Sequence, residues 1–197
     1  MVMIEERTRE AFVEVLAPTP VARPVPAAEV AATDRTITTG YVWGALRLAM
    51  GWVFLWGFID KLFGLGYATA RDAAWINGGS PTFGFLNFGA KGPFAELYKS
   101  MAGSVIVDWS FMMGLLLIGL PLMLGIGVRL AATGGVLMLT LMYTAGFILP
   151  EHNLFLDEHI VYAVIMIGLI TAGGGRYLGF GGWWSKTRLV ERFPVLK

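Results

Sequence analysis

Apolar residues gather in four long stretches of this chain, and polar residues are concentrated between the stretches and at the two ends. The stretches cover residues 39–63, 105–128, 130–149 and 160–178. Each is close to the ~20 residues that an α-helix needs to cross a hydrocarbon core of ~30 Å. The pattern predicts an all-α integral membrane protein, a four-helix bundle that crosses the lipid bilayer four times.

Composition supports a membrane protein and excludes several other classes. Hydrophobic residues make up 56% of the chain and charged residues only 15%, and the mean hydropathy is +0.64. The net charge of +1 argues against a nucleic-acid partner, which would require clustered basic residues. Cysteine is absent, which excludes disulfides, thiolate nucleophiles, iron–sulfur clusters and c-type haem attachment. We therefore expect no covalently bound cofactor.

The two ends differ from the middle, which gives three parts: 1–36, 37–180 and 181–197. The acidic start does not fit a secretory signal, and its apolar residues fall at helical spacing. The start of the chain is either a disordered tail or an amphipathic helix that docks on a partner or on the bundle. A proline-rich extended linker follows it, up to Asp34. Residues 37–180 form the membrane domain. Residues 181–197, with Trp183 and Trp184 among basic side chains, are typical of an interfacial tail.

The distribution of basic residues predicts the orientation. With both termini in the cytoplasm, the inner side of the cell membrane holds ten Lys and Arg and the outer side holds four, apart from one arginine inside a span. Residues 64–103 then form a long external loop, rich in aromatic and turn residues, which we expect to lie on the bilayer surface as a cap over the bundle. Pro93 predicts a short helix that extends to Ala102.

Charged residues inside or beside the spans are candidates for a ligand site, because such charges are costly in lipid. Arg47 lies about seven residues into the first span, and no acid occupies the same half of any span. It must reach headgroups, cap backbone carbonyls or bind an anionic or carbonyl-bearing ligand. Asp60 and Lys61 end the first span and Asp108 begins the second. These three form either an interhelical network or ordinary interfacial anchors.

The third polar group precedes the fourth span and holds both histidines of the chain. It comprises Glu151, His152, Asp157, Glu158 and His159. Capping of the fourth helix explains the acids. A metal site, haem ligation and a hydrogen-bonded quinone headgroup are alternatives for the histidines, although the spacing matches no zinc pattern. Because the topology carries Asp60, Asp108, His152, Glu158 and His159 to one face, we expect them to form one pocket beneath the aromatic loop.

These residues also resemble a known family. The likeness to DoxX/DoxD-type membrane proteins is carried by residues 46–51 (LRLAMG), Asp60-Lys61-Leu62, 75–82 (WINGGSPT), 125–129 (GIGVR) and 159–162 (HIVY), within residues 41–194. The resemblance implies the four-span fold. One branch of the family supplies the large subunit of a thiosulfate:quinone oxidoreductase, which implies quinone as the acceptor, and other members are similar to accessory proteins. The lack of cysteine and of flavin or haem signatures argues against thiosulfate as the substrate.

Three functions follow as hypotheses. The first is a membrane protein of a redox-linked system that binds quinone near the outer interface. The second is a non-catalytic subunit of a larger respiratory or export complex, which packs against a protein partner or a second copy through glycine-rich helices. Those glycines are equally suited to packing the chain's own spans. The third is a small-solute transporter, although the spans show no broken helices or repeat symmetry.

Overall fold

The computed structural model describes residues 27–146, 153–154 and 156–196, and in these ranges the chain is helical with no strand. The chain divides into two units, Met1–Thr36 and Ile37–Lys197. The first helix, α2 (Ala27–Phe63), begins well before the predicted residue 39. The predicted extended linker up to Asp34 is therefore wrong from Ala27 onward. The prolines stop at Pro26, and the alanine-rich segment that follows favours a helix.

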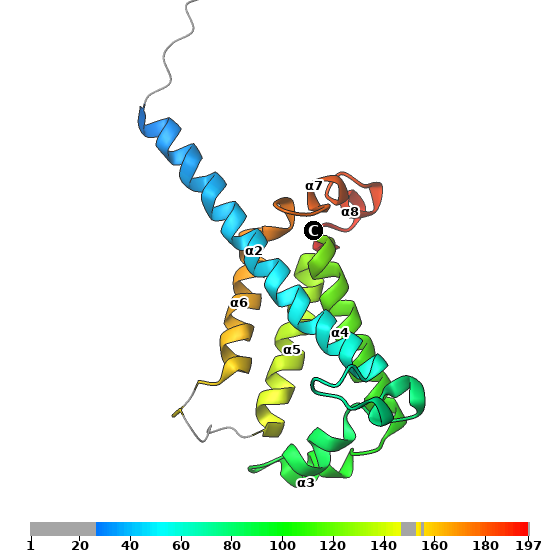
Figure 1. Cartoon of the computed structure of the whole chain (residues 1–197). Helices are drawn as coiled ribbons and strands as arrows, with labels where there is room; N and C mark the ends of the chain where they lie inside the picture. Colours follow the sequence, from blue (N-terminus) through cyan, green and yellow to red (C-terminus); the bar gives the residue numbers. More distant parts are fainter. Residues whose placement is uncertain (1–26, 147–152, 155, 197) are drawn as a thin grey trace, which may run out of the picture. The chain divides into compact units, whose positions relative to one another are not determined.

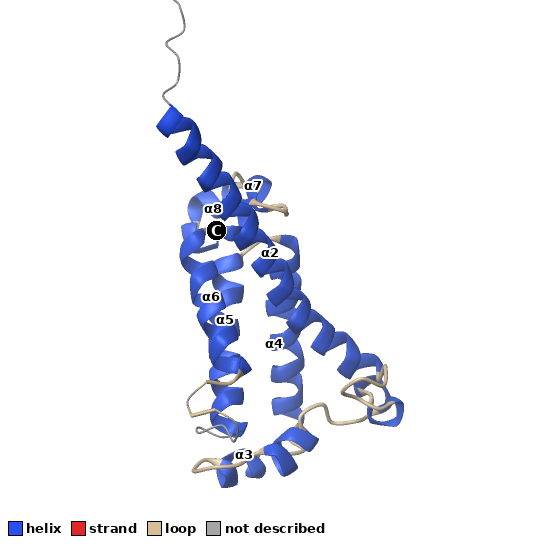
Figure 2. Ribbon diagram, turned by 60° about the vertical axis from the view of Figure 1, so that its left-hand side comes forward, coloured by secondary structure: helices blue, strands red, loops and turns tan. Residues whose placement is uncertain are grey.

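Four helices of the second unit form an antiparallel bundle (Figures 1 and 2). They are residues 37–63 of α2, α4 (Val105–Leu124), α5 (Val128–Gly146) and α6 (Glu158–Ala172). Among the described residues, three helical segments are long and apolar enough to cross a membrane: Arg35–Phe63, α4 and α5. At 15 residues, or about 22 Å, α6 is shorter than a typical span. It ends at Ala172 rather than at the predicted residue 178, because Gly173 adopts a left-handed conformation (φ 63°).

The core and the outer surface of the bundle are both apolar. Met112, Leu122 and Met166 are completely buried at the centre, and α5 packs against both α4 and α6. Large apolar side chains also cover the outside of the same helices, among them Leu117, Leu137, Val164 and Ile167. A helix that is apolar on all sides is typical of a lipid environment rather than of water.

Glycines bring the helices close together. A Cβ at Gly119 of α4 would lie 2.5 Å from the backbone nitrogen of Leu55 in α2, and a Cβ at Gly51 would lie 2.9 Å from that of Met123. Gly135 of α5 faces Met166 of α6 in the same way. All eight glycines that the sequence marks as packing positions have neighbours in this chain: Gly40, Gly44, Gly51, Gly57, Gly114, Gly119, Gly134 and Gly135. They serve the chain's own packing, which was one of the two roles left open.

The segment between α2 and α4 folds into short turns at one end of the bundle. These are η1 (Arg71–Ala73), η2 (Trp75–Asn77), the π-helical turn η3 (Phe85–Gly89) and α3 (Ala95–Ser100). The segment reaches the end of α5, where the Lys91 amide donates to the Ala145 carbonyl (2.9 Å). The predicted short helix exists as α3, but it begins at Ala95, two residues after Pro93.

The C-terminal segment lies at the opposite end of the bundle (Figures 1 and 2). After α6 it forms η4 (Gly174–Arg176), α7 (Gly181–Trp184), α8 (Arg188–Arg192) and η5 (Pro194–Leu196). The indole nitrogen of Trp184 donates to the Leu196 carbonyl (2.7 Å), and Val190 is completely buried. The segment is thus folded against the bundle, with η5 packed on α5.

Candidate functional site

Arg47 lies at the centre of a set of backbone carbonyls. It is completely buried, so it does not reach out to headgroups. Nη1 donates to the carbonyls of Leu122 and Met123 in the last turn of α4 (3.1 Å to Met123), and Nη2 donates to those of Tyr177 (3.2 Å) and Leu178 (2.9 Å). Of the three roles open to Arg47, the structure shows the capping of backbone carbonyls.

The sequence explains why an arginine is required there. The last four carbonyls of a helix have no partner within it, and in lipid water cannot satisfy them. The guanidinium group carries five N–H donors in a fixed fork, so one arm serves α4 while the other holds the C-terminal segment. The Phe180 amide donates to the next carbonyl, that of Leu124 (2.8 Å). Arg47 therefore joins three segments that are distant in the sequence.

Asp60 and Asp108 organise the connecting segment at the other end. Both are buried (2% and 6% exposed). The carboxylate of Asp60 accepts from the backbone amides of Tyr67 (3.4 Å) and Ala68 (3.1 Å). Oδ1 of Asp108 accepts from the hydroxyl of Ser80 (2.9 Å), and from the amide (3.2 Å) and hydroxyl (2.5 Å) of Thr82. Each acid thus fixes its own part of the loop.

The predicted network of Asp60, Lys61 and Asp108 is not what these contacts form. Within the part of the chain that the structure describes, no hydrogen bond joins Asp60 to Asp108. Lys61 is half-buried and follows Asp60 in the chain, and the ion pairs of the described residues do not include these two. The two acids fit the alternative of separate anchors better. Both carboxylates accept from backbone N–H groups, and Asp108 also accepts from two hydroxyls.

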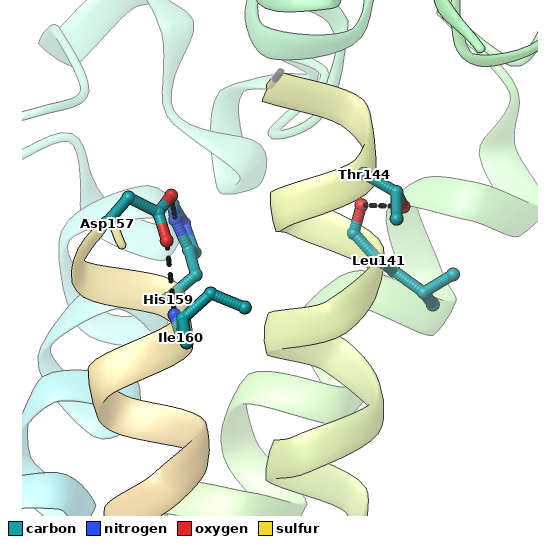
Figure 3. A network of polar contacts seen from close by, with 5 residues as sticks. All are labelled: Leu141, Thr144, Asp157, His159 and Ile160. Carbon is teal, nitrogen blue, oxygen red and sulfur yellow. Dashed lines mark hydrogen bonds and ion pairs between the residues drawn. The ribbon is translucent and has the colours of Figure 1, made fainter. Parts of the chain in front are cut away.

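Asp157 and His159 form a second polar site at the start of α6 (Figure 3). Oδ1 of Asp157 accepts from the Ile160 amide (3.1 Å) and caps the helix, as the sequence predicts, while Oδ2 lies 2.8 Å from Nδ1 of His159. Both side chains are about one-fifth exposed. In the described ranges, Nδ1 is the only ring nitrogen of His159 with a partner. The imidazole is therefore oriented by a carboxylate, with Nε2 available.

The end of α5 contributes a hydroxyl pair near the same end of the bundle. Thr144, drawn across from Asp157 and His159 in Figure 3, accepts from the hydroxyl of Tyr98 in α3 (2.6 Å), because its own proton goes to a carbonyl. Thr144 also donates to the Leu141 carbonyl (3.0 Å). This contact connects α3 to α5, so the segment between α2 and α4 is attached to the end of α5.

Within the described ranges, no hydrogen bond joins the residues that the sequence groups into one pocket, and that pocket stays a prediction. Asp60, Asp108 and His159 each have their own partners, and among the described residues none bonds to another. Glu158 is exposed, and His152 lies outside the described residues. Asp157 belongs to the third polar group of the sequence but not to the predicted pocket, and Tyr98 and Thr144 belong to neither. For Asp157 a signal existed, since a helix-capping acid two residues before a histidine can reach its ring.

Comparisons with known proteins add no relative. No protein-family model, curated protein or solved structure matches this chain. Nor do three metal-ligating side chains come together anywhere in the described ranges.

Proposed function

We propose that this chain is a DoxX-type protein of the cell membrane that binds a quinone headgroup at Asp157 and His159 and serves a redox-linked membrane system. The oriented imidazole carries the proposal, because it is an interfacial group that can exchange protons. A pair that is one-fifth exposed is open to a ligand, unlike Arg47, Asp60 and Asp108, which are buried against their own chain.

The chemistry of the pair suits both forms of a quinone. With Nδ1–H held by Asp157, a neutral imidazole presents Nε2 as an acceptor for the hydroxyl of a quinol. An imidazolium presents Nε2–H as a donor to a quinone carbonyl. One proton on His159 therefore separates the two binding modes, and the contact with Asp157 orients the ring in both.

Binding of decylubiquinone to the purified full chain in detergent tests the proposal. H159Q should weaken binding about tenfold or more, because it removes one charge-assisted hydrogen bond to the ligand. D157N should weaken it less, because Asn also caps helices and accepts from the Ile160 amide while giving up the charge beside the ring. E158Q, at an exposed neighbour, is the control. A decylubiquinone affinity that is equal in wild type and H159Q would refute the assignment.

The proposed topology has four spans with both termini in the cytoplasm. A chain without cysteine allows single reporters, and F88C and V195C replace exposed residues at opposite ends of the bundle (75% and 57%). An impermeant maleimide added outside intact cells should label F88C and leave V195C unlabelled. The reverse pattern would invert the orientation, and labelling of both or neither would contradict an even number of crossings.

A non-catalytic subunit of a larger membrane complex is the second candidate. The observation that favours it is that Arg47, Asp60 and Asp108 all bind their own chain, and that no buried polar side-chain atom in the described residues lacks a partner. Extraction in mild detergent, followed by mass spectrometry of proteins and quinones, distinguishes the two. A stoichiometric protein partner without quinone would favour the subunit, and quinone retained by wild type but not by H159Q would favour the quinone protein.

A further inference from the structure

The two ends of the bundle carry opposite charge. At the end with the C-terminal segment, the described residues include five exposed basic side chains and one acid, Glu191; the basic ones are Arg129, Arg176, Lys186, Arg188 and Arg192. In the described ranges, the opposite end holds four basic residues (Lys61, Arg71, Lys91, Lys99) and six acids (Asp60, Asp72, Glu96, Asp108, Asp157, Glu158). With buried Arg47 added to the first end, as buried Asp60 and Asp108 are counted at the second, the net charges over the described residues are +5 (6 − 1) and −2 (4 − 6).

The basic side chains do not serve the fold through ion pairs. Among the described residues, none of the five lies in a salt bridge, whereas Lys99 at the other end pairs with Glu96 (3.4 Å). The guanidinium carbon of Arg192 lies 5.7 Å from the centre of the Phe193 ring, a contact that involves no carboxylate. Five unpaired cations at one end repel one another, and an anionic partner would remove that cost.

The segment that carries four of the five is held in place and exposes apolar side chains as well as basic ones. Arg47 and the Phe180–Leu124 bond fix its start, and buried Val190 and the Trp184–Leu196 bond fix its end. Large apolar side chains remain exposed beside the basic ones: Phe180 (62%), Trp183 (67%), Leu189, Phe193 and Val195. Exposed indole and phenyl rings among Lys and Arg are typical of a surface at the headgroup layer.

We propose that this surface, Arg129, Arg176, Lys186, Arg188 and Arg192 with the exposed rings around them, binds the phosphate headgroups of anionic phospholipids. The apolar side chains enter the acyl boundary while the cations contact phosphate. The occupant is lipid rather than a free anion, because a soluble anion would not cover the exposed apolar side chains. The surface lies at the opposite end of the bundle from Asp157 and His159, so the proposal is independent of quinone binding.

Native mass spectrometry of the purified full chain with equimolar phosphatidylglycerol and phosphatidylcholine tests the proposal. Wild type should retain phosphatidylglycerol in preference. The triple variant K186Q/R188Q/R192Q should lose roughly a hundredfold in that preference, about fivefold for each basic side chain near an anionic surface. The matched control, R71Q/K91Q/K99Q, removes the same charge from the other end and should behave as wild type.

Three further measurements keep the result interpretable. R188K/R192K preserves the charge and should preserve the preference. High salt should lower the preference of wild type, and inorganic phosphate should not compete with the lipid. An equal loss in both triple variants, no preference in wild type, or displacement of the lipid by inorganic phosphate would each overturn the proposal. The altered side chains are all exposed, so helix content and gel-filtration volume should not change.

Discussion

Replacement of Arg47 tests whether one buried arginine holds the C-terminal segment on the bundle. Its two nitrogens serve four carbonyls, those of Leu122, Met123, Tyr177 and Leu178. A hydrogen bond from a charged donor is worth about 1.5–3 kcal/mol, and the four are not additive. We expect R47M to lower the free energy of unfolding by about 4 kcal/mol, or roughly a thousandfold in the folding equilibrium.

The lysine variant separates charge from geometry. A lysine ammonium is a single point with three donors, so it can serve α4 or the C-terminal segment but cannot reach both as the guanidinium fork does. R47K should therefore lose one arm and cost about 2 kcal/mol, half of the R47M effect. Arg129 is exposed and has no ion pair in the described residues, so R129M is the control and should be nearly neutral.

Two assays on the full chain measure these effects. Unfolding by a rising fraction of SDS in mixed micelles gives the free-energy differences. Hydrogen exchange of the peptide that contains Phe180 reports on the docked segment, because the amide of Phe180 is bonded to the Leu124 carbonyl. R47M should speed that exchange strongly. If R47M unfolds and exchanges like R129M, or R47K behaves as wild type, the arginine does not hold the two segments together.

Three further substitutions test the packing and the turns. G119A should destabilise the bundle by about 2 kcal/mol, because its Cβ would lie 2.5 Å from the Leu55 nitrogen. G57A, with its nearest neighbours at 3.9 Å, should be neutral or stabilising, and equal unfolding midpoints for the two variants would contradict the close crossing of α2 and α4. D108A should lower the free energy of unfolding by about 2 kcal/mol and speed amide exchange in residues 80–83. D108N should lower it less, because Asn retains the Oδ1 that accepts all three hydrogen bonds, and equal exchange in the two variants would refute this role of Asp108. Leu178 has φ +56°, so L178G should be about 1 kcal/mol more stable than L178A in the same unfolding assay, and no difference would mean that the backbone is not strained.

The sequence predicts the helices better than the partners of the charged residues. Hydrophobic stretches place three membrane-competent helices within a few residues at most ends, and the cap at Asp157 follows from local chemistry. Because no acid lies nearby, the sequence leaves three roles open for Arg47, and one of them is the capping of carbonyls. The sequence does not predict which carbonyls these are, because two of them belong to a segment about 130 residues further along the chain. Likewise Asp108 binds Ser80 and Thr82, across 26 to 28 residues of irregular chain. Periodicity carries no information on how an irregular segment folds back.

The same irregular segments explain why charged residues lie at the ends of these spans. A segment without regular hydrogen bonds brings N–H and C=O groups toward lipid, where water cannot satisfy them. At one end the free groups are carbonyls of a helix C-terminus, and a cation, Arg47, donates to them. At the other end they are loop amides, and two anions, Asp60 and Asp108, accept from them. The sign of each charge matches the backbone group that it serves.

This match divides the charged residues of the chain into two kinds. Arg47, Asp60 and Asp108 are buried and bound to their own chain, so their replacement should change stability before it changes any activity. His159 and the basic residues of the C-terminal end have donors or acceptors without a partner among the described residues. These are the groups on which the proposed binding of quinone and of phospholipid depends. Variants of the second kind should therefore alter ligand binding at unchanged stability, and this contrast is the test that separates folding residues from functional ones in this protein.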